Sequence, residues 1–396
     1  MRADGGLIRQ KSNCNLYQHI LMLLRRAALQ KDGVCKSALP APRILRALLL
    51  RQNKYGKNMK AAVLVRFGNA QDAFEIRELP DLPCKPHEVR VAVATFGLNF
   101  ADVVARLGQY QDCPPLPAVI GYEVVGQVLE TGAEVTHVQP GQRVLAFTRF
   151  GGYATQIVTD ARAVVPLPDF IPDAEATALA TQYCTAYFSA CMAINLWPGD
   201  HVLIQAAAGG VGIALTQIAK NAGCTVYGTA GSDAKLETIR KNGVDVPINY
   251  TTHNFARVIE KTAPNGKIDV VFDSVGGQSV REGIKLLNSG GRMVCFGAAD
   301  MSGANKLQVA WKAMQFGLYH PVQFMLRSAS LTGVNMLRIA ENKPLVLQQC
   351  LQEVVKKAAE GQLKPIVHGV YPISQLWQAH EALQHRSTVG KLAIQW

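Results

Sequence analysis

The sequence predicts an α/β protein in which a β-rich region is followed by a doubly wound parallel sheet. Residues 60–185 consist of short apolar strand patterns separated by proline and glycine. From about residue 188, strand and helix patterns alternate, and repeated β-α units build parallel sheets. A glycine-rich turn joins the first strand of this second region directly to an apolar helix.

The first region, residues 59–187, is predicted to be one β-rich domain. A strand pattern begins at Met59. Further apolar strands are expected at residues 89–94, 124–129 and 142–147. Pairs such as Pro140-Gly141 and Gly151-Gly152 mark the turns that end them.

The second region, residues 188–335, is predicted to be the parallel-sheet domain, and residues 336–396 are predicted to return to the first domain. Gly223 and Gly243 end the two clearest helices, at residues 212–221 and 234–242. The expected strands cover residues 201–205, 225–229, 269–273 and 292–297. After residue 335 the pattern indicates a helix at 345–360 and a closing strand at 391–395.

The positive charge is concentrated at the N-terminus. The 396 residues have a net charge of +12, and residues 1–58, with twelve basic and two acidic side chains, account for +10 of it. The remainder is close to neutral at +2, so composition argues against a nucleic-acid partner. Residues 1–58 are interpreted as a basic, disordered extension of a cytoplasmic protein; a mitochondrial presequence is the alternative.

No membrane span and no metal site are predicted. Residues 202–219 are uncharged and long enough for a span, but three glycines lie at their middle, as expected for a strand, a turn and a helix. The closest pair among the nine cysteines is seven residues apart, so no Cys-x2-Cys motif exists. The nine histidines show no ligand spacing, and the cysteine usage suits a reducing compartment.

The glycine-rich turn has the form Ala207-x-Gly209-x-x-Gly212 and lies between a strand and a helix. This is a dinucleotide-binding pattern in its expected context, with alanine at the first glycine position. A tight turn without a ligand is the alternative. The predicted pyrophosphate contacts are Ala208, Gly209, Gly210, Val211 and Gly212.

Together with this turn, four further motifs resemble the zinc-independent quinone oxidoreductases, the zeta-crystallin-like family of the medium-chain dehydrogenase/reductase superfamily. The motifs are Asn99-Phe100-Ala101-Asp102, Gly121-Tyr122-Glu123, Gly228-Thr229-Ala230-Gly231-Ser232 and Asp273-Ser274-Val275-Gly276-Gly277. The resemblance runs from Met59 to Trp396. It implies a GroES-like catalytic domain, a Rossmann domain, a cleft between them and a homodimer. Residues 301–336 are longer than in the simplest members.

The resemblance also predicts what the cleft does. Metal-dependent relatives carry zinc ligands where this chain has Asn99 and Tyr122, so alcohol oxidation assisted by zinc is disfavoured. Hydride transfer from NADPH to a quinone or an α,β-unsaturated carbonyl remains. The alternatives are enoyl thioester reduction, with Tyr110 as the acid, and a non-catalytic NADPH- or RNA-binding protein of the same fold.

Three residues are the catalytic candidates. Asn99 is expected to orient the substrate carbonyl or the nicotinamide ribose, and a turn-stabilising role is the alternative. Tyr110 matches a tyrosine that lines the cofactor site, and also the proton donor of enoyl thioester reductases; simple packing is the alternative. Thr185 matches a threonine beside the nicotinamide, although an ordinary helix threonine explains it nearly as well.

NADPH is predicted over NADH. Ala230 stands where NAD-selective domains place an acid, so no carboxylate repels a 2′-phosphate. The family places phosphate contacts at Lys235, Tyr250 and Arg386, whereas a solvated lysine and a surface arginine are the alternatives. The resemblance adds three further cofactor contacts, Ser232, Ser274 and Phe296.

Overall fold

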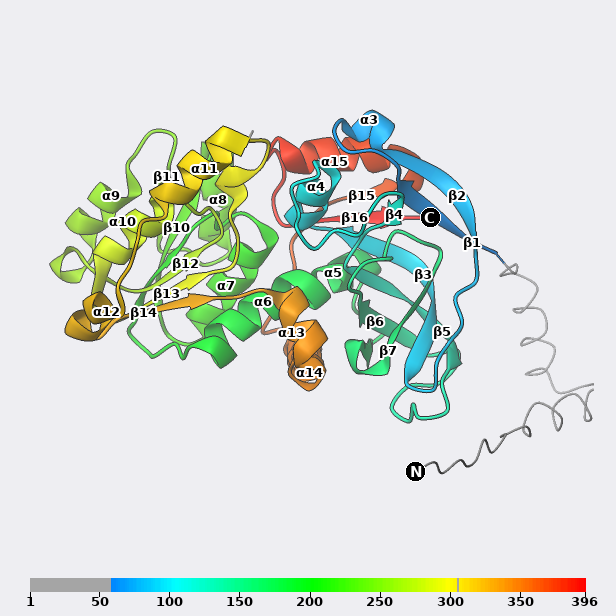
Figure 1. Ribbon diagram of the computed structural model, residues 1–396. Helices are drawn as coiled ribbons and strands as arrows, with labels where there is room; N and C mark the ends of the chain where they lie inside the picture. The colour runs from blue at the N-terminus through cyan, green and yellow to red at the C-terminus, as the bar shows by residue number, and fades with distance from the viewer. Residues whose placement is uncertain (1–57, 305) are drawn as a thin grey trace, which may run out of the picture. The chain divides into compact units, whose positions relative to one another are not determined.

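A computed structural model describes residues 58–304 and 306–396 (Figure 1). The predictions for the basic extension therefore lie outside the described residues. Two larger sheets dominate the described part, one built mainly from antiparallel pairs and one entirely parallel. The predicted fold class is confirmed.

The antiparallel pairs belong to a seven-stranded sheet centred on β3 (Glu88–Leu98), which pairs with β5, β7 and β16. Val89, Val91 and Phe96 of β3 are completely buried, so the strand forms the core of this domain. A second, three-stranded sheet has the order β2-β1-β4. The other strands of these sheets are β1 (Asn58–Leu64), β2 (Phe74–Pro80), β4 (Ala118–Val119), β5 (Glu123–Thr131), β6 (Arg143–Phe147), β7 (Gln156–Asp160), β8 (Val164–Pro166), β15 (Val367–Pro372) and β16 (Lys391–Gln395).

The parallel sheet has the strand order β11-β10-β9-β12-β13-β14. The first strand in sequence lies at the centre and the order reverses beside it, which is the doubly wound arrangement of dinucleotide-binding domains. The predicted strands at 201–205, 225–229 and 269–273 fall on β9, β10 and β12. The bounds are β9 (His201–Ile204), β10 (Thr225–Ala230), β11 (Val246–Asn249), β12 (Ile268–Asp273), β13 (Leu287–Cys295) and β14 (Ser330–Gly333).

The helices of the second domain connect these strands and cover the sheet (Figure 1). Fully buried apolar side chains on both faces of the sheet, such as Val202 and Leu203 on β9, belong to two separate cores. The helices are α7 (Gly210–Asn221), α8 (Asp233–Lys241), α9 (Phe255–Thr262), α10 (Gln278–Leu286), α11 (Lys306–Gln315) and α12 (Pro321–Arg327).

The chain passes between the two sheets twice. A continuous helical stretch from α5 (Asp173–Ala178) to Ala193 leads into β9, and it contains two π-helical segments, Leu179–Tyr183 and Phe188–Ala193. Such segments are often found at functional sites. The return uses α13 (Met336–Asn342), α14 (Pro344–Ala359) and α15 (Leu376–Gln384) before β16 pairs with β3. The remaining helices are α3 (Ala70–Ala73), α4 (Phe100–Arg106) and α6 (Cys184–Tyr187).

His380 on α15 is a buried histidine in the core of the first domain. Its Nε2 lies 3.1 Å from the Tyr153 hydroxyl, and the Phe74 ring packs on it with 4.9 Å between centroids. Burial, assisted by the charge of Arg106, lowers the pKa of His380 to about 3. The folded protein therefore holds this imidazole neutral, whereas the unfolded chain protonates it near pH 6.5.

Replacing His380 should reduce acid sensitivity. Between pH 6.5 and about 3 the unfolded state binds one proton more than the folded state. This group should therefore lower the free energy of unfolding by about 1.4 kcal/mol for each unit by which the pH falls in that range. Urea titrations at several pH values should show that the free energy of unfolding falls less steeply with decreasing pH for His380→Gln than for the wild type. The exposed His87→Gln is the control; equal slopes in all three proteins would contradict this assignment.

Candidate active site

The parallel sheet brings the predicted cofactor residues to one edge. Nearly all of them lie at or just after the C-terminal end of a strand, and the C-terminal ends of parallel strands share one edge of the sheet. Only Arg386 comes from elsewhere, in the segment before β16. The positions that meet are Ala208–Gly212 after β9, Ala230, Ser232 and Lys235 at and after β10, Tyr250 after β11, Ser274 after β12 and Phe296 after β13.

The glycine-rich turn is shaped to accept a phosphate. Ala206 begins it with a positive φ of 53°, and its carbonyl accepts the Gly209 N–H at 2.9 Å. A Cβ on Gly212 would lie 2.5 Å from the Ala206 oxygen, so only glycine fits there. A Cβ on Gly209 would have one neighbour within 4 Å, the Ala206 oxygen at 3.3 Å. The outer side of Gly209 is therefore open for a ligand.

The first turn of α7 supplies donors to the same place. Gly209 is the N-cap residue, and no side chain caps the helix. The first N–H groups of a helix have no partner within it, and the helix dipole adds positive potential there. This part of the site therefore fits a dinucleotide pyrophosphate.

Two basic residues, Lys235 and Arg386, are in contact beside the end of β10. The Lys235 Nζ donates to the backbone oxygen of Arg386, although 151 residues separate them. Burial and the nearby Arg386 lower the pKa of Lys235. The Tyr250 hydroxyl lies against Gly231, where a Cβ would be only 2.5 Å from it. Asp233 accepts a hydrogen bond from the Asn249 amide at 2.9 Å.

A buried ion pair lies on the other side of the site. The side chains of Glu123 and Lys391 are both completely inaccessible and are in direct contact. Glu123 also accepts hydrogen bonds from the Asn99 amide, at 2.8 and 2.9 Å, and from the Thr181 hydroxyl. Burial raises the pKa of Glu123, and its partners oppose that shift.

Asn99 is held at both ends of its side chain. Its amide nitrogen faces Glu123, while its oxygen accepts from Lys391 Nζ at 3.1 Å. The backbone N–H of Asn99 donates to Asp102 at 2.8 Å, which fixes the start of α4. These contacts use both ends of the Asn99 amide within the protein, and its role in orienting a substrate carbonyl or the nicotinamide ribose stays a prediction.

Thr185 and Thr181 are linked to each other. Thr185 is 9% exposed, and its hydroxyl donates to the Thr181 carbonyl at 2.7 Å. Thr181 in turn binds Glu123 through its own hydroxyl. The π-helical segment thus joins the helix between the domains to the buried ion pair.

Tyr110 belongs to an aromatic cluster next to this network. Its ring is 6.3 Å from that of Tyr122, which packs on Phe150 at 5.4 Å. Burial raises the pKa of Tyr110 to about 12, and the carboxylates of Asp112 and Asp102 add to the effect. The Tyr122 hydroxyl is buried and lacks a hydrogen bond of normal geometry within the described chain.

The loop that carries Tyr110 is attached to the second half of the chain on both sides of this residue. Gln109 donates from Nε2 to the Ala304 oxygen at 2.9 Å and accepts from the Gly303 N–H at 2.7 Å. Asp112 forms an ion pair with Arg338 on α13. The position of Tyr110 is therefore set by the contacts of its neighbours Gln109 and Asp112.

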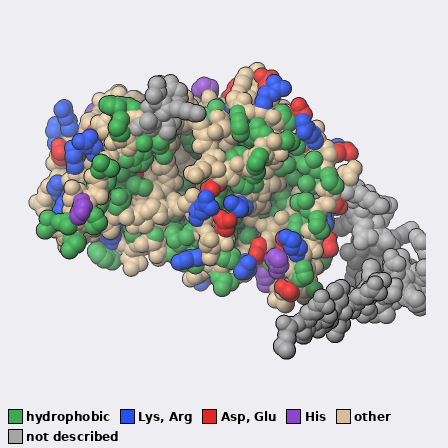
Figure 2. All heavy atoms as spheres, viewed as in Figure 1, with side chains coloured by type: hydrophobic (Ala, Val, Ile, Leu, Met, Phe, Trp, Pro, Cys, Tyr) green, Lys and Arg blue, Asp and Glu red, His purple; other side chains and the backbone are tan. Residues whose placement is uncertain are grey.

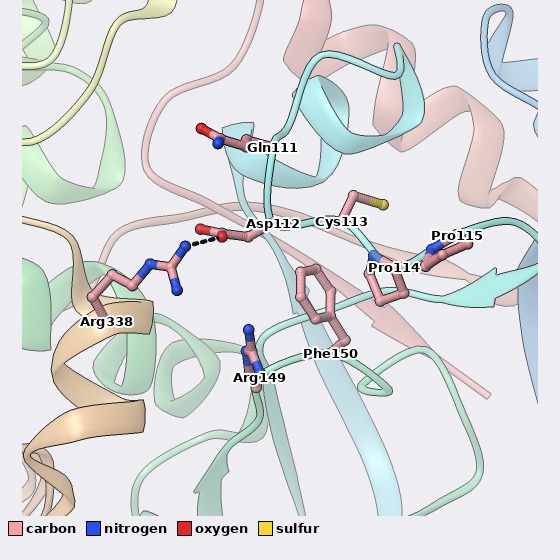
Figure 3. A pocket seen from close by; sticks show the side chains of 8 residues that line it. All are labelled: Gln111, Asp112, Cys113, Pro114, Pro115, Arg149, Phe150 and Arg338. Carbon is pink, nitrogen blue, oxygen red and sulfur yellow. Dashed lines mark hydrogen bonds and ion pairs between the residues drawn. The ribbon is translucent and has the colours of Figure 1, made fainter.

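A pocket of about 610 Å³ opens beside this loop (Figure 3). Phe150 connects it to the aromatic cluster, and Asp112 connects it to Tyr110. Figure 3 shows two arginine side chains on one side and the Phe150 ring with two prolines on the other. The lining residues are Gln111, Asp112, Cys113, Pro114, Pro115, Arg149, Phe150 and Arg338.

Within residues 58–304 and 306–396, no three His, Cys, Asp or Glu side chains are grouped as a metal ion would require. The same residues include no helix that is both long and apolar enough to cross a membrane.

Sequence reasoning missed several members of the buried network and of the contacts that hold the Tyr110 loop. Glu123 lies in one of the family motifs, but the motif alone assigns it no role. Lys391 had a detectable signal, since it is the one charged residue of an otherwise mainly apolar strand, 391–395. Thr181, Gln109 and Arg338 had none, because their partners are distant in sequence.

Comparisons with known proteins match this architecture. Residues 85–169 match the alcohol dehydrogenase GroES-like domain, and residues 210–353 match the zinc-binding dehydrogenase family. The chain is 31% identical over 340 residues to quinone oxidoreductase-like protein 2 of Bos taurus, covering 86% of this chain and 93% of that protein. The structure of the Escherichia coli quinone oxidoreductase complexed with NADPH is similar, with a TM-score of 0.75, 27% identity and coverage of 85% and 100%.

A third relative is much longer. It belongs to the phenolphthiocerol/phthiocerol polyketide synthase of Mycobacterium tuberculosis and is 33% identical over 323 residues, or 82% of this chain. This chain spans only 14% of that protein's length.

A GroES-like domain joined to a Rossmann domain with a glycine-rich turn defines a medium-chain dehydrogenase/reductase. Within this superfamily the chain belongs to the zeta-crystallin-like quinone oxidoreductase family.

Separating Glu123 from Lys391 should cost much of the stability. Lys391→Met leaves a buried carboxylate without its main partner, and breaking a buried pair costs about 3–5 kcal/mol. Glu123→Gln should destabilise similarly, whereas the double variant should lose clearly less than the sum of the two. Chemical denaturation of all four proteins measures this coupling.

The exposed pair Lys220–Asp245 is the matched control, and Lys220→Met should change stability by less than about 1 kcal/mol. Strictly additive losses at positions 123 and 391 would show that the buried pair does not act as a unit.

Proposed function

We propose that this protein is an NADPH-dependent reductase that transfers hydride, without a zinc ion, to a quinone or an α,β-unsaturated carbonyl compound. The main supporting observation is what fills the zinc-ligand positions of metal-dependent relatives. Asn99 is bound into the Glu123–Lys391 network, and Tyr122 is part of an aromatic cluster beside an open pocket. A site built in this way favours direct hydride delivery to an acceptor that is already electron-poor.

Bound NADPH would supply the hydride, and a proton from solvent or a side chain would complete the reduction of the acceptor. The chain itself contributes binding and orientation. Tyr110 is protonated at neutral pH, and burial, which raises its pKa to about 12, keeps it so; the phenol can therefore donate a hydrogen bond to a substrate oxygen. A general acid contributes about 10²–10⁴ in rate when its pKa is close to the working pH, so a phenol with a pKa of about 12 is better suited to donating a hydrogen bond than to transferring a proton.

The preference for NADPH rests on Lys235 and Arg386. Lys235 donates to the backbone oxygen of Arg386, which places both residues near the end of β10, and Ala230 there leaves no carboxylate to oppose a 2′-phosphate. A homodimer and a cytoplasmic location stay predictions of the sequence.

Reductase activity is tested by following NADPH oxidation with three acceptors in parallel: a quinone, an enone and an enoyl thioester. The quinone and the enone should be reduced, and a chelator should leave the rate unchanged. If only the thioester reacts and Tyr110→Phe abolishes the reaction, the enoyl thioester reductase alternative replaces this proposal. NADPH binding without reduction of any acceptor would favour a non-catalytic role.

Lys235→Ala should weaken NADPH binding about tenfold and leave NADH binding nearly unchanged. Hydrogen bonds between charged groups contribute about 1.5–3 kcal/mol, and the partial exposure of this lysine places the effect at the lower end. Fluorescence titration with both cofactors measures the change. Lys241→Ala, at a more exposed lysine of the same helix, is the control. Equal losses for both cofactors would contradict the assignment of Lys235 to the 2′-phosphate.

A further inference from the structure

Four charged side chains form a continuous chain at the mouth of the pocket. Asp112 pairs with Arg338, Arg338 with Glu341 at 3.2 Å, and Glu341 with Arg149 at 3.3 Å. Two of them come from α13 and two from loops of the GroES-like domain. Figure 2 shows basic and acidic side chains gathered on the visible face, close to the place of α13 in Figure 1.

The arginines are the accessible members of this chain of charges. The side chains of Arg149 and Arg338 are 53% and 52% exposed, whereas those of Asp112 and Glu341 are 15% and 36% exposed. Both arginines line the pocket, and Figure 3 shows their guanidinium groups directed toward the same space. A ligand that enters therefore meets positive charge first.

Both arginines keep unused donors. A guanidinium has five N–H groups, and among the described residues Arg149 pairs through Nη1 with Glu341 alone. Arg338 uses Nη1 and Nη2. The planar donor array of arginine suits the paired oxygens of a carboxylate or the oxygens of a phosphate.

The opposite wall of the pocket suits an apolar group. It consists of Phe150, Pro114 and Pro115, and Phe150 leads through Tyr122 to Tyr110. The pocket thus has an apolar side that continues toward the reactive centre and a cationic side at the mouth.

We propose that Arg149 and Arg338 form an anion-binding subsite, and that the preferred substrate is an activated alkene or quinone carrying a carboxylate or phosphate at the end remote from the reducible bond. This inference rests on the proposed reductase function. The anion would share the two guanidinium groups with Asp112 and Glu341, and the apolar part of the substrate would lie along Phe150.

The experiment compares three substrates with the same carbon chain: a vinyl ketone with a terminal carboxylate, its methyl ester and its phosphate monoester counterpart. For the wild type, kcat/KM should be at least about tenfold higher for the carboxylate, the phosphate or both than for the ester. The anionic substrate with the larger kcat/KM relative to the ester shows whether the subsite prefers a carboxylate or a phosphate.

Variants distinguish an anion site from a merely structural ion-pair network. Arg149→Gln should lower the ratio of kcat/KM for the anionic substrate to kcat/KM for the ester about tenfold. Glu341→Gln, which removes a competing carboxylate, should raise that ratio severalfold. A structural network would make both variants affect the anion and the ester equally. Arg257→Gln, at an exposed arginine on α9, should keep the wild-type ratio.

Calorimetric titration of the saturated carboxylate and its methyl ester tests the subsite without turnover. Preferential binding of the carboxylate, lost in Arg149→Gln, supports the subsite even if no alkene is reduced, in which case only the reductase proposal fails. A wild-type ratio near one, or a ratio that neither Arg149→Gln nor Glu341→Gln changes, overturns the subsite and leaves the reductase proposal intact.

Discussion

The contact between Glu123 and Lys391 is the constraint on which the arrangement of the site depends. Both side chains are completely buried, and a buried charge without a partner costs several kcal/mol. The segments that supply the partners must therefore keep their relative positions: β5, the start of α4 at Asn99, the π-helical segment at Thr181 and the start of β16. One electrostatic centre thus orders both the substrate side of the site and the helix that leads to the second domain.

The same pair is connected to the cofactor side through the backbone. Lys391 follows Gly390, whose N–H donates to the Ala208 oxygen at 2.9 Å, and Gly390 forms a β-bridge with Gly209. A few residues earlier, Arg386 accepts a hydrogen bond from Lys235. The segment from residue 386 to 391 therefore runs from the cationic end of the Rossmann domain, past the glycine-rich turn, to the buried carboxylate. This segment therefore connects the glycine-rich turn to the packing around Asn99 through a continuous stretch of backbone.

Tyr110 shows how the fold positions a candidate site residue through its neighbours. Its loop is attached by Gln109 to the backbone at Gly303 and Ala304, and by Asp112 to α13. One contact joins this loop to the connection between β13 and β14, and the other joins it to α13, which follows β14. The pocket beside the loop combines an apolar wall with two accessible arginines, so its shape and its charge both depend on how these segments meet.

The sequence by itself determined the fold class, most strand positions and the phosphate turn, because periodicity and glycine spacing are local properties. It also suggested, through the resemblance, that Lys235 and Arg386 serve one phosphate, and the structure brings them into contact. Only the tertiary structure decided that Asn99 is enclosed by Glu123 and Lys391, because this depends on β16 pairing with β3 across almost 300 residues. The pairing of Arg338 with Asp112 across 226 residues has the same origin: long-range contacts arise when whole elements pack, and no local pattern encodes them.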